Sequence, residues 1–383
     1  MIKPRFYSKW HKLTDVMLGT TYPHEYYDGL DDNIRDPLLQ LTDETLQDLE
    51  HFENVLKQFG CNVIRPDVSK ASISEWIEQN QIMPTHFSQS VRPPLQVRDA
   101  QLVIGDKLVF VSTDNKDIRT TLLNHVDSKN IMMHPNVMRK TNLSNPMHSQ
   151  SPYGEGSISA TELTVLGKTI LIESLEQVQK GSWTKSEQRL KDIDWFINKM
   201  PEYDWYPIQE GGHTDAQWHM IKPGVALSLP GLESIDELLT SDIDVCYLNE
   251  TDFSMHDNIT KSKWSMAEGK WWLPGEESNS DLVTFINKWM SQWTGEMQET
   301  VFDLNILVLD DRHICINKTN KKLEDFLKKH NMEPIIVPWR HRYFWDGGLH
   351  CITLDLRREG PIEDYSYIKN SSASQKLTMR ENR

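Results

Sequence analysis

The stretch Leu102–Val111 reads LVIGDKLVFV, which is an apolar half-strand, a tight Gly-Asp turn and a second apolar half-strand. This order is typical of a β-hairpin, because glycine and aspartate favour tight turns and the flanking residues favour strands. Three later stretches repeat the pattern: LTVLGKTILI from Leu163, HMIKPGVALS from His219 and ILVLDDRHICI from Ile306. Four similar hairpins in one chain predict a repeated architecture in which each unit packs against its neighbours.

A helix and two strands are predicted near the N-terminus. Apolar residues recur at helical spacing over Leu46–Gly60, and Gly60 stands where a C-terminal cap belongs. The following CNVIRPD segment from Cys61 reads as a buried strand that ends in a turn, and another strand begins near Asp15. No linker rich in Pro, Gly and Ser divides the chain. We therefore expect one domain over 1–383, with its polar end at 362–383 as a loosely ordered tail.

The composition excludes several classes of protein. A formal charge of −15 repels nucleic acid and anionic membranes and favours a cationic substrate. No apolar run approaches the roughly 20 residues of a membrane-spanning helix. The basic N-terminal stretch also lacks the apolar segment of a removable presequence. We expect no nucleic-acid or membrane partner and a cytoplasmic location; a homodimer is compatible with the sequence, which does not determine the oligomeric state.

The cysteine pattern predicts reduced thiols and no metal site. No two of the four cysteines form a CxxC pair, and they are too scattered for a small disulfide framework: Cys61, Cys246, Cys315 and Cys351. A nucleotide site has no support either. Gly167-Lys168-Thr169 lacks the glycine that a phosphate-binding loop needs five positions earlier.

Cys351 is the first candidate for chemistry. It follows two glycines and a histidine in WDGGLHCITL, which begins at Trp345. If this stretch is a strand, alternation places Cys351 on the face opposite Ile352 and Leu354. Gly347 and Gly348 would allow another group to approach closely. The cysteine is then either a nucleophile or a small buried hydrophobe, and the pattern alone leaves both open.

Three further positions carry acids or bases. In EGGHTDAQW, an extended strand would project His213 and Asp215 from one face about 7 Å apart, although such a pair also occurs on ordinary surfaces. Glu162 precedes the second hairpin and points away from the face of Leu163. Asp99 lies at the mouth of the first hairpin, where a solvated turn is the alternative interpretation.

These motifs together resemble the glycine amidinotransferase family. The stretch HRYFWDGGLHCITLDLRREG is similar to the C-terminal signature of that family, in which a Gly-Gly-x-His-Cys run carries the nucleophile. HTDAQW, SATELTVLGKTI, VRDAQLVIGDKLV and VLKQFGCNVIRPD resemble further family segments, in the same order over nearly the whole chain. The resemblance implies an α/β fold, the pentein propeller of five pseudo-symmetric ββαβ units around a central active site.

The resemblance also implies roles for individual residues. Cys351 would be the nucleophile, His213 the general acid and base, and Glu162 and Asp215 the acids that grip a guanidinium, with Asp99 as a further substrate contact. Two carboxylates suit this task, because a guanidinium offers a planar fork of N–H donors. Gly348, Asn305 and Asp303 are carried over as substrate-site residues, and no cofactor or metal is implied.

The chain departs from the family at four positions. Glu162 replaces an aspartate, and Asp346 stands where the family has a third glycine. Leu232 occupies the position of an arginine thought to hold a substrate carboxylate, and Asp303 that of a small hydroxyl residue.

From this resemblance we expect an amidinotransferase that takes the amidino group of L-arginine through a covalent amidino-cysteine, in a ping-pong reaction. Glycine is the default acceptor, with guanidinoacetate and ornithine as products. The alternatives are a different acceptor amine, or an arginine deiminase-like hydrolase that yields citrulline. A binder of guanidino compounds without catalysis would need no thiol.

Overall fold

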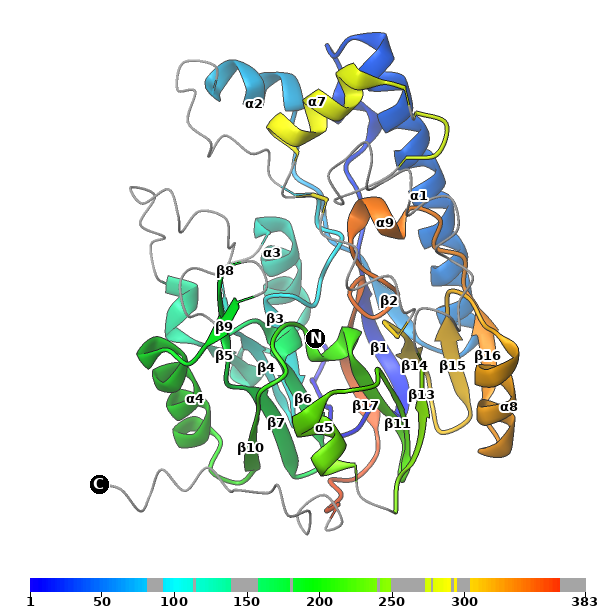
Figure 1. The fold of residues 1–383 in the computed structure, drawn as a ribbon. Helices are drawn as coiled ribbons and strands as arrows, with labels where there is room; N and C mark the ends of the chain where they lie inside the picture. The colour runs from blue at the N-terminus through cyan, green and yellow to red at the C-terminus, as the bar shows by residue number, and fades with distance from the viewer. Residues whose placement is uncertain are drawn as a thin grey trace.

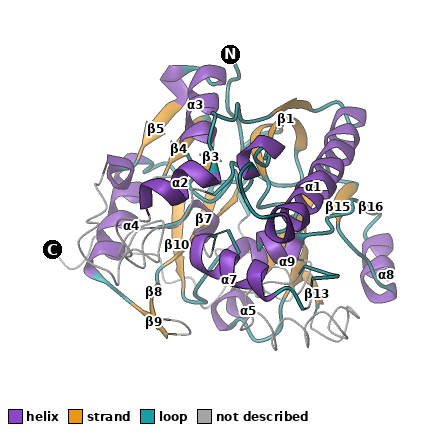
Figure 2. Ribbon diagram, turned by 90° about the horizontal axis from the view of Figure 1, so that it is seen from above, coloured by secondary structure: helices purple, strands orange, loops and turns teal. Residues whose placement is uncertain are grey.

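The strands of the protein form small sheets that follow one another around the molecule (Figure 2). The computed structural model describes residues 1–80, 92–112, 115–138, 158–179, 182–239, 242–248, 273–276, 278–290, 293–294 and 304–365. Within these residues the strands form five three-stranded sheets and one separate two-stranded hairpin. In each three-stranded sheet the middle strand pairs antiparallel with one neighbour and parallel with the other.

Each of the four predicted hairpins supplies the first two strands of one sheet, so these predictions are confirmed. A helix then returns the chain to a third strand, which is parallel to the second. The first two units comprise β3 (Gln101–Ile104), β4 (Lys107–Phe110), α3 (Lys116–His125) and β5 (Ile131–Met133), then β6 (Leu163–Leu166), β7 (Thr169–Glu173), α4 (Glu187–Lys199) and β10 (Asp204–Ile208). The small hairpin of β8 (Glu176–Gln179) and β9 (Ser182–Thr184) lies between β7 and α4 in sequence.

The next two units have the same order of elements. They comprise β11 (Trp218–Lys222), β12 (Val225–Ser228), α5 (Glu233–Leu238) and β13 (Asp244–Tyr247), then β14 (Leu307–Val308), β15 (His313–Ile316), α8 (Lys321–Lys329) and β16 (Glu333–Ile336). Within the described residues, three more α-helices lie outside this repeat: α2 (Ile73–Asn80), α7 (Ser280–Trp289) and α9 (Arg342–Trp345).

The fifth unit joins the two ends of the described chain. The C-terminal strand β17 (Thr353–Glu359) pairs antiparallel with the N-terminal strand β1 (Lys12–Leu18), as Figure 1 shows. The helix α1 (Asp32–Gln58) then leads to β2 (Asn62–Ile64), which is parallel to β1. The repeat is therefore ββαβ in all five units, and the fifth closes the ring.

The predicted helix over Leu46–Gly60 is the second half of α1, which begins at Asp32. Its first half contains Pro37 and many polar residues, so the spacing of apolar side chains did not reveal it. Leu38 and Leu41 are nevertheless fully buried, and this packing supports a helical start that propensity alone would not favour.

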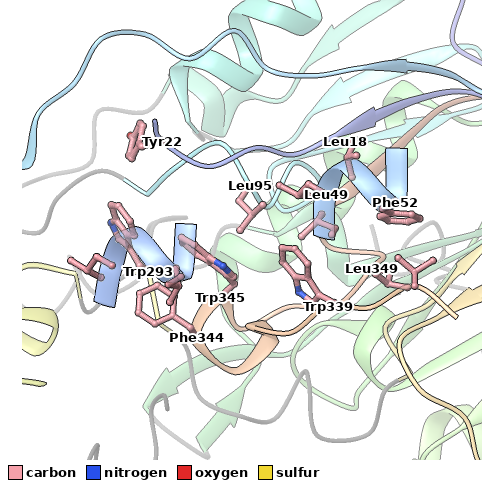
Figure 3. Close-up of a cluster of buried hydrophobic side chains, with 14 of the residues drawn as sticks. Leu18, Tyr22, Leu49, Phe52, Leu95, Trp293, Trp339, Phe344, Trp345 and Leu349 are labelled. Atoms are coloured by element: carbon pink, nitrogen blue, oxygen red, sulfur yellow. The ribbon is translucent and has the colours of Figure 1, made fainter. Parts of the chain in front are cut away.

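A large apolar cluster packs between α1 and the C-terminal segment that carries Cys351 (Figure 3). Leu49 and Phe52 of α1 contribute to the same cluster as Trp339 and Trp345. Leu349, two residues before Cys351, is fully buried in it. The backbone that leads to the cysteine is therefore anchored on one side by the core.

The expected tail over 362–383 falls mostly outside the described residues. Of its first part, Tyr365 is buried, and its ring lies 5.2 Å from that of Trp10. The backbone carbonyl of Glu363 accepts a hydrogen bond from the amide of Lys168 at 2.9 Å. The chain is thus attached to the ring as far as Tyr365. Among the described helices, none has the length and apolar character needed to cross a membrane.

Candidate active site

The predicted site residues that the structure describes share one position in the ββαβ repeat. Five of them lie in the loop just before the first strand of a unit: Asp99 before β3, Glu162 before β6, Asp215 before β11, Asn305 before β14 and Cys351 before β17. His213 and Gly348 lie in the same loops as Asp215 and Cys351. Because the units repeat around the ring, these loops occupy equivalent ends of the five sheets.

Hydrogen bonds connect the five loops to one another. The Cys351 loop receives bonds from the side chains of Asn305 and Arg98 and is linked through His350 to Asp215. Thr214 Oγ1 donates to the carbonyl of Thr161 at 2.8 Å. The loop before β6 is held to the loop before β3, because Ser159 Oγ donates to the carbonyl of Asp99 at 2.8 Å. The candidate residues are therefore gathered at one end of the propeller.

Cys351 lies in a turn, and the expectation that it belongs to the strand was wrong. The strand β17 begins at Thr353, two residues later. The side chain is 1% exposed, so its surroundings are set by a tight turn and not by the two faces of a strand. The turn frees the backbone N–H of Cys351 to bind a side chain from another loop.

The side chain of Asn305 makes three hydrogen bonds with this turn. Its Oδ1 accepts the backbone N–H groups of His350 and Cys351, each at 2.9 Å. Its Nδ2 donates to Sγ of Cys351 at 3.0 Å. A donor at this distance favours the thiolate form of the cysteine, which is the nucleophilic form.

The other side of the turn is held by Arg98 and Gln96. Arg98 Nε donates to the carbonyls of His350 at 3.0 Å and Thr353 at 2.9 Å. Gln96 Nε2 donates to the carbonyls of Trp345 at 2.5 Å and Asp346 at 3.1 Å. Arg98 and Asp99 thus do not form a solvated turn, since both residues are buried.

Gly348 is required by close packing. A Cβ at this position would lie 2.6 Å from Cβ of Asn305 and 2.7 Å from its carbonyl oxygen. Both distances are shorter than real Cβ contacts, and the nearest atoms belong to a residue that is itself bound to the turn. A glycine here lets Asn305 reach Cys351.

His213 and Asp215 do not lie on an extended strand, so that expectation was also wrong. Thr214–Ala216 form a short 3-10 helix, and His213 is its N-terminal capping residue. Asp215 is buried and its Oδ2 lies 2.6 Å from Nδ1 of His350. Burial lowers the pKa of His350 well below its ordinary value, with Arg98 and Lys9 adding to the effect. The neutral ring therefore donates its Nδ1–H to the carboxylate.

The sequence did not point to a buried lysine beneath the site. Lys9 is 6% exposed, and its Nζ lies 2.5 Å from Nδ1 of His219. His219 Nε2 in turn donates to the carbonyl of Asp215 at 2.6 Å. Burial lowers the pKa of Lys9 to about 7, although the negative charge of Asp215 opposes the shift. No motif marks this residue, because Lys9 and His219 are 210 positions apart.

Glu173 holds the backbone that leads to His213, and it too was missed from the sequence. Its Oε2 accepts the N–H groups of Glu210 at 2.9 Å and Gly211 at 2.8 Å, while Oε1 accepts that of Leu175 at 2.7 Å. Burial raises the pKa of Glu173 to about 7. Three backbone donors on one buried carboxyl group make this loop well defined.

Glu162 is bound by the chain's own arginine. It ends the short 3-10 helix Ala160–Glu162, where Ser159 N–H donates to Oε2 at 2.7 Å in a capping box. Arg189 of α4 donates from Nη1 to Oε2 at 2.6 Å and from Nη2 to Oε1 at 3.1 Å. Both side chains are buried. The sequence gave no sign of this pair, whose members lie 27 positions apart on a loop and a helix.

Of the three remaining predicted positions, the structure describes two, Asp99 and Leu232. Asp99 is buried in its loop. Leu232 precedes α5 as its capping residue and packs against an apolar cluster, so no cation stands at that position. Asp303 lies outside the described residues.

A small cavity of about 30 Å³ lies beneath these loops. Its walls include Lys9, Arg98, Asp215, His350 and Asp355. Within the part of the chain that the structure describes, no group of three His, Cys, Asp or Glu side chains is arranged to hold a metal ion. The site therefore presents a thiol, a histidine and several carboxylates, a set suited to covalent chemistry on a cationic group.

Comparison with known proteins finds amidinotransferases among the relatives of this chain. An L-arginine:L-lysine amidinotransferase from Pseudomonas savastanoi pv. phaseolicola is 33% identical over 212 residues, which are 55% of this chain and 47% of that protein. Over these residues the chain is similar in sequence to an amidinotransferase. The mitochondrial glycine amidinotransferase of Xenopus tropicalis is 25% identical over 178 residues, which are 45% of this chain and 34% of that relative. Each match spans less than half of the relative's length. No protein-family model matches the chain.

The amidinotransferase fold is also found by comparison with solved structures. SxtG, an amidinotransferase of the saxitoxin biosynthetic pathway from Microseira wollei, superposes with a TM-score of 0.59 at 16% identity. The superposition covers 94% of this chain and 99% of that protein. At this identity the likeness concerns the fold. The expected pentein propeller of five ββαβ units is confirmed.

Proposed function

We propose that the protein is an amidinotransferase that uses Cys351 as its nucleophile and L-arginine as its donor. The observation that carries the proposal is the contact between Asn305 Nδ2 and Cys351 Sγ, 3.0 Å long, at the end of the ring where the acidic loops meet. A purely structural buried cysteine needs no such donor, whereas a thiolate is stabilised by it. The homology to amidinotransferases supports the same conclusion.

The reaction follows from these groups. The Cys351 thiolate would attack the guanidinium carbon while carboxylates including Asp215 and Asp99 hold its N–H groups. The bond from carbon to the departing nitrogen then breaks, and His213 gives that nitrogen a proton, which leaves an amidino-cysteine and ornithine. An acceptor amine would lose a proton to His213, attack the amidino carbon and release the thiolate. Electrons and protons balance over the two half-reactions without an oxidant.

Glycine remains the default acceptor in this proposal, but L-lysine is an equally direct candidate. One relative acts on L-arginine and L-lysine and another is named for glycine. Leu232 adds apolar surface where a cation was expected, which favours an acceptor with an aliphatic part. If water replaced the amine, the protein would be a hydrolase.

An acceptor screen tests the proposal. The protein is incubated with L-arginine alone and with glycine, L-lysine or a diamine, and ornithine and citrulline are measured. Ornithine that depends on an amine is the expected result. Citrulline formed without an amine would establish hydrolysis instead. If neither ornithine nor citrulline forms, both the transferase and the hydrolase are contradicted.

Mass spectrometry tests the covalent step directly. After a brief incubation with L-arginine, an amidino adduct is expected on the peptide with Cys351 and on no peptide with Cys61, Cys246 or Cys315. These three serve as internal controls because they are buried in the same chain. The Cys351→Ala variant should keep its thermal midpoint and lose turnover. Turnover near wild type in that variant would exclude this nucleophile.

A further inference from the structure

The contact between Arg189 and Glu162 is a guanidinium on a carboxylate inside the candidate site. Arg189 is 2% exposed and Glu162 is 6% exposed. Arg189 is the third residue of α4, and its backbone N–H donates to Ser186 Oγ at 3.0 Å. The helix start therefore holds the base of the side chain in place.

The geometry is the forked arrangement that a substrate guanidinium would adopt. Two terminal nitrogens of Arg189 donate to the two oxygens of Glu162, at 2.6 Å and 3.1 Å. Oε2 also accepts the backbone N–H of Ser159 at 2.7 Å. A second guanidinium cannot form the same fork on Glu162 while Arg189 remains there, because Arg189 occupies the edge of the carboxylate on which that fork forms.

We infer that Arg189 competes with the donor guanidinium for Glu162 and so weakens the binding of every guanidinium ligand. This inference rests on the proposed function, in which a substrate guanidinium binds Glu162. Arg189 is the competitor within that site. When a donor binds Glu162, the ion pair between Arg189 and Glu162 must break. The donor must supply the free energy for this change through contacts with other residues. The cost is the same for every guanidinium ligand, but L-arginine has an amino-acid part whose contacts can offset it, whereas small guanidines do not.

The size of the effect follows from the population of the open form. The apparent dissociation constant of a ligand is raised by the inverse of the fraction of molecules that can bind it. If Glu162 is open in at most about one molecule in ten, methylguanidine binds about tenfold more weakly than it would to a site without Arg189.

The test measures binding without turnover. In the Cys351→Ala background, methylguanidine and L-arginine are titrated by calorimetry into proteins with Arg189 and with Arg189→Ala. Arg189→Ala should tighten methylguanidine binding at least about tenfold and L-arginine binding by a similar factor. Arg189→Lys keeps the positive charge but cannot form the forked pair of hydrogen bonds. Its dissociation constants should lie between those of the protein with Arg189 and of Arg189→Ala. Unchanged or weaker binding in both variants would overturn the inference and leave a purely structural ion pair.

Arg340→Ala is the matched control. Arg340 donates from Nε to Oδ1 of the buried Asp48 at 2.9 Å, in a pair that involves α1 and not the site loops. Its loss should leave both dissociation constants unchanged. A change equal to that of Arg189→Ala would show a general effect of losing an ion pair, and would overturn the inference.

The outcome is separable from that of the proposed function. Tighter binding in Arg189→Ala together with no amidino transfer by the wild-type protein would retain the inference and remove the function. Amidino transfer by the wild-type protein, with no change in binding in Arg189→Ala, would retain the proposed function and remove the inference. Thermal midpoints of all variants are measured first, and Arg189→Lys keeps the test decisive if Arg189→Ala does not fold.

Discussion

Nδ2 of Asn305 lies 3.0 Å from Sγ of Cys351, although the two residues are 46 positions apart in sequence. They belong to the loops before β14 and β17, and they meet because those loops occupy equivalent ends of two sheets in the ring. The same amide group binds the cysteine's thiol and its backbone N–H. It therefore sets both the reactivity and the position of the sulfur atom.

Asn305→Ala is expected to slow the alkylation of Cys351 by iodoacetamide at neutral pH about tenfold, because a hydrogen bond to a charged group contributes roughly 1.5–3 kcal/mol. Asn305→Asp should slow it further, since a carboxylate would repel the thiolate. Peptide mass spectrometry measures the rate. Asn136→Ala is the control: Asn136 is equally buried, at 4% exposure, but binds Asp192. Alkylation of Asn305→Ala at the wild-type rate would contradict the role of the amide.

Gly348→Ala is expected to abolish most activity and to cost about 1–3 kcal/mol of stability, as overpacking does. The new Cβ would stand 2.6 Å from Cβ of Asn305 and push it away from Cys351. Gly60→Ala is a useful comparison, since Gly60 has a φ of +83° and a Cβ there would meet no atom within 4 Å. That variant should lose stability through backbone strain and retain activity. Equal losses of activity in both would remove the steric explanation.

Glu173→Gln is expected to lower kcat at least tenfold with a small change in thermal midpoint. The carbonyl oxygen of glutamine can accept an N–H but its NH2 group cannot, so at least one backbone bond to Leu175, Glu210 or Gly211 is lost and the loop before His213 moves. Small misplacements of a proton donor can reduce rates about a hundredfold. Faster hydrogen exchange in the peptide with Gly211 is the accompanying signal. Wild-type exchange there would show that Glu173 does not hold the loop.

Lys9 is expected to make stability rise with pH above neutrality. Its pKa is about 7 in the folded protein, below the ordinary 10.5, because the buried ammonium lacks water. Between these values the unfolded chain holds a proton that the folded protein has released, so the free energy of unfolding increases with pH. Below about pH 7 Lys9 is charged in both states, and the free energy of unfolding is lowered by the full cost of burying its ammonium group. In Lys9→Met this slope should disappear, as urea unfolding from pH 7 to pH 10 would measure. An equal slope in both proteins would assign it to another group.

Some features of the site could be read from the sequence and others could not. Cys351, Asp215 and Asn305 were found through motifs, and the structure brings their loops together. The strand expected at Cys351 and at His213 is replaced by a turn and a 3-10 helix, because local alternation cannot distinguish a strand from the loop that leads into it. No sequence pattern indicated Arg189, because its contact with Glu162 depends on how α4 packs and not on the spacing of residues in the sequence.

The sequence by itself determined four hairpins, the second half of α1 and the strand after it. These depend on turn residues and on the period of apolar side chains, which are local properties. Only the tertiary structure decided the fifth unit, in which β17 pairs with β1 from the other end of the chain, and the contacts of Lys9 and Glu162. Lys9 and His219 lie 210 positions apart, and Glu162 and Arg189 lie on a loop and a helix, so these contacts form only when separate elements pack together.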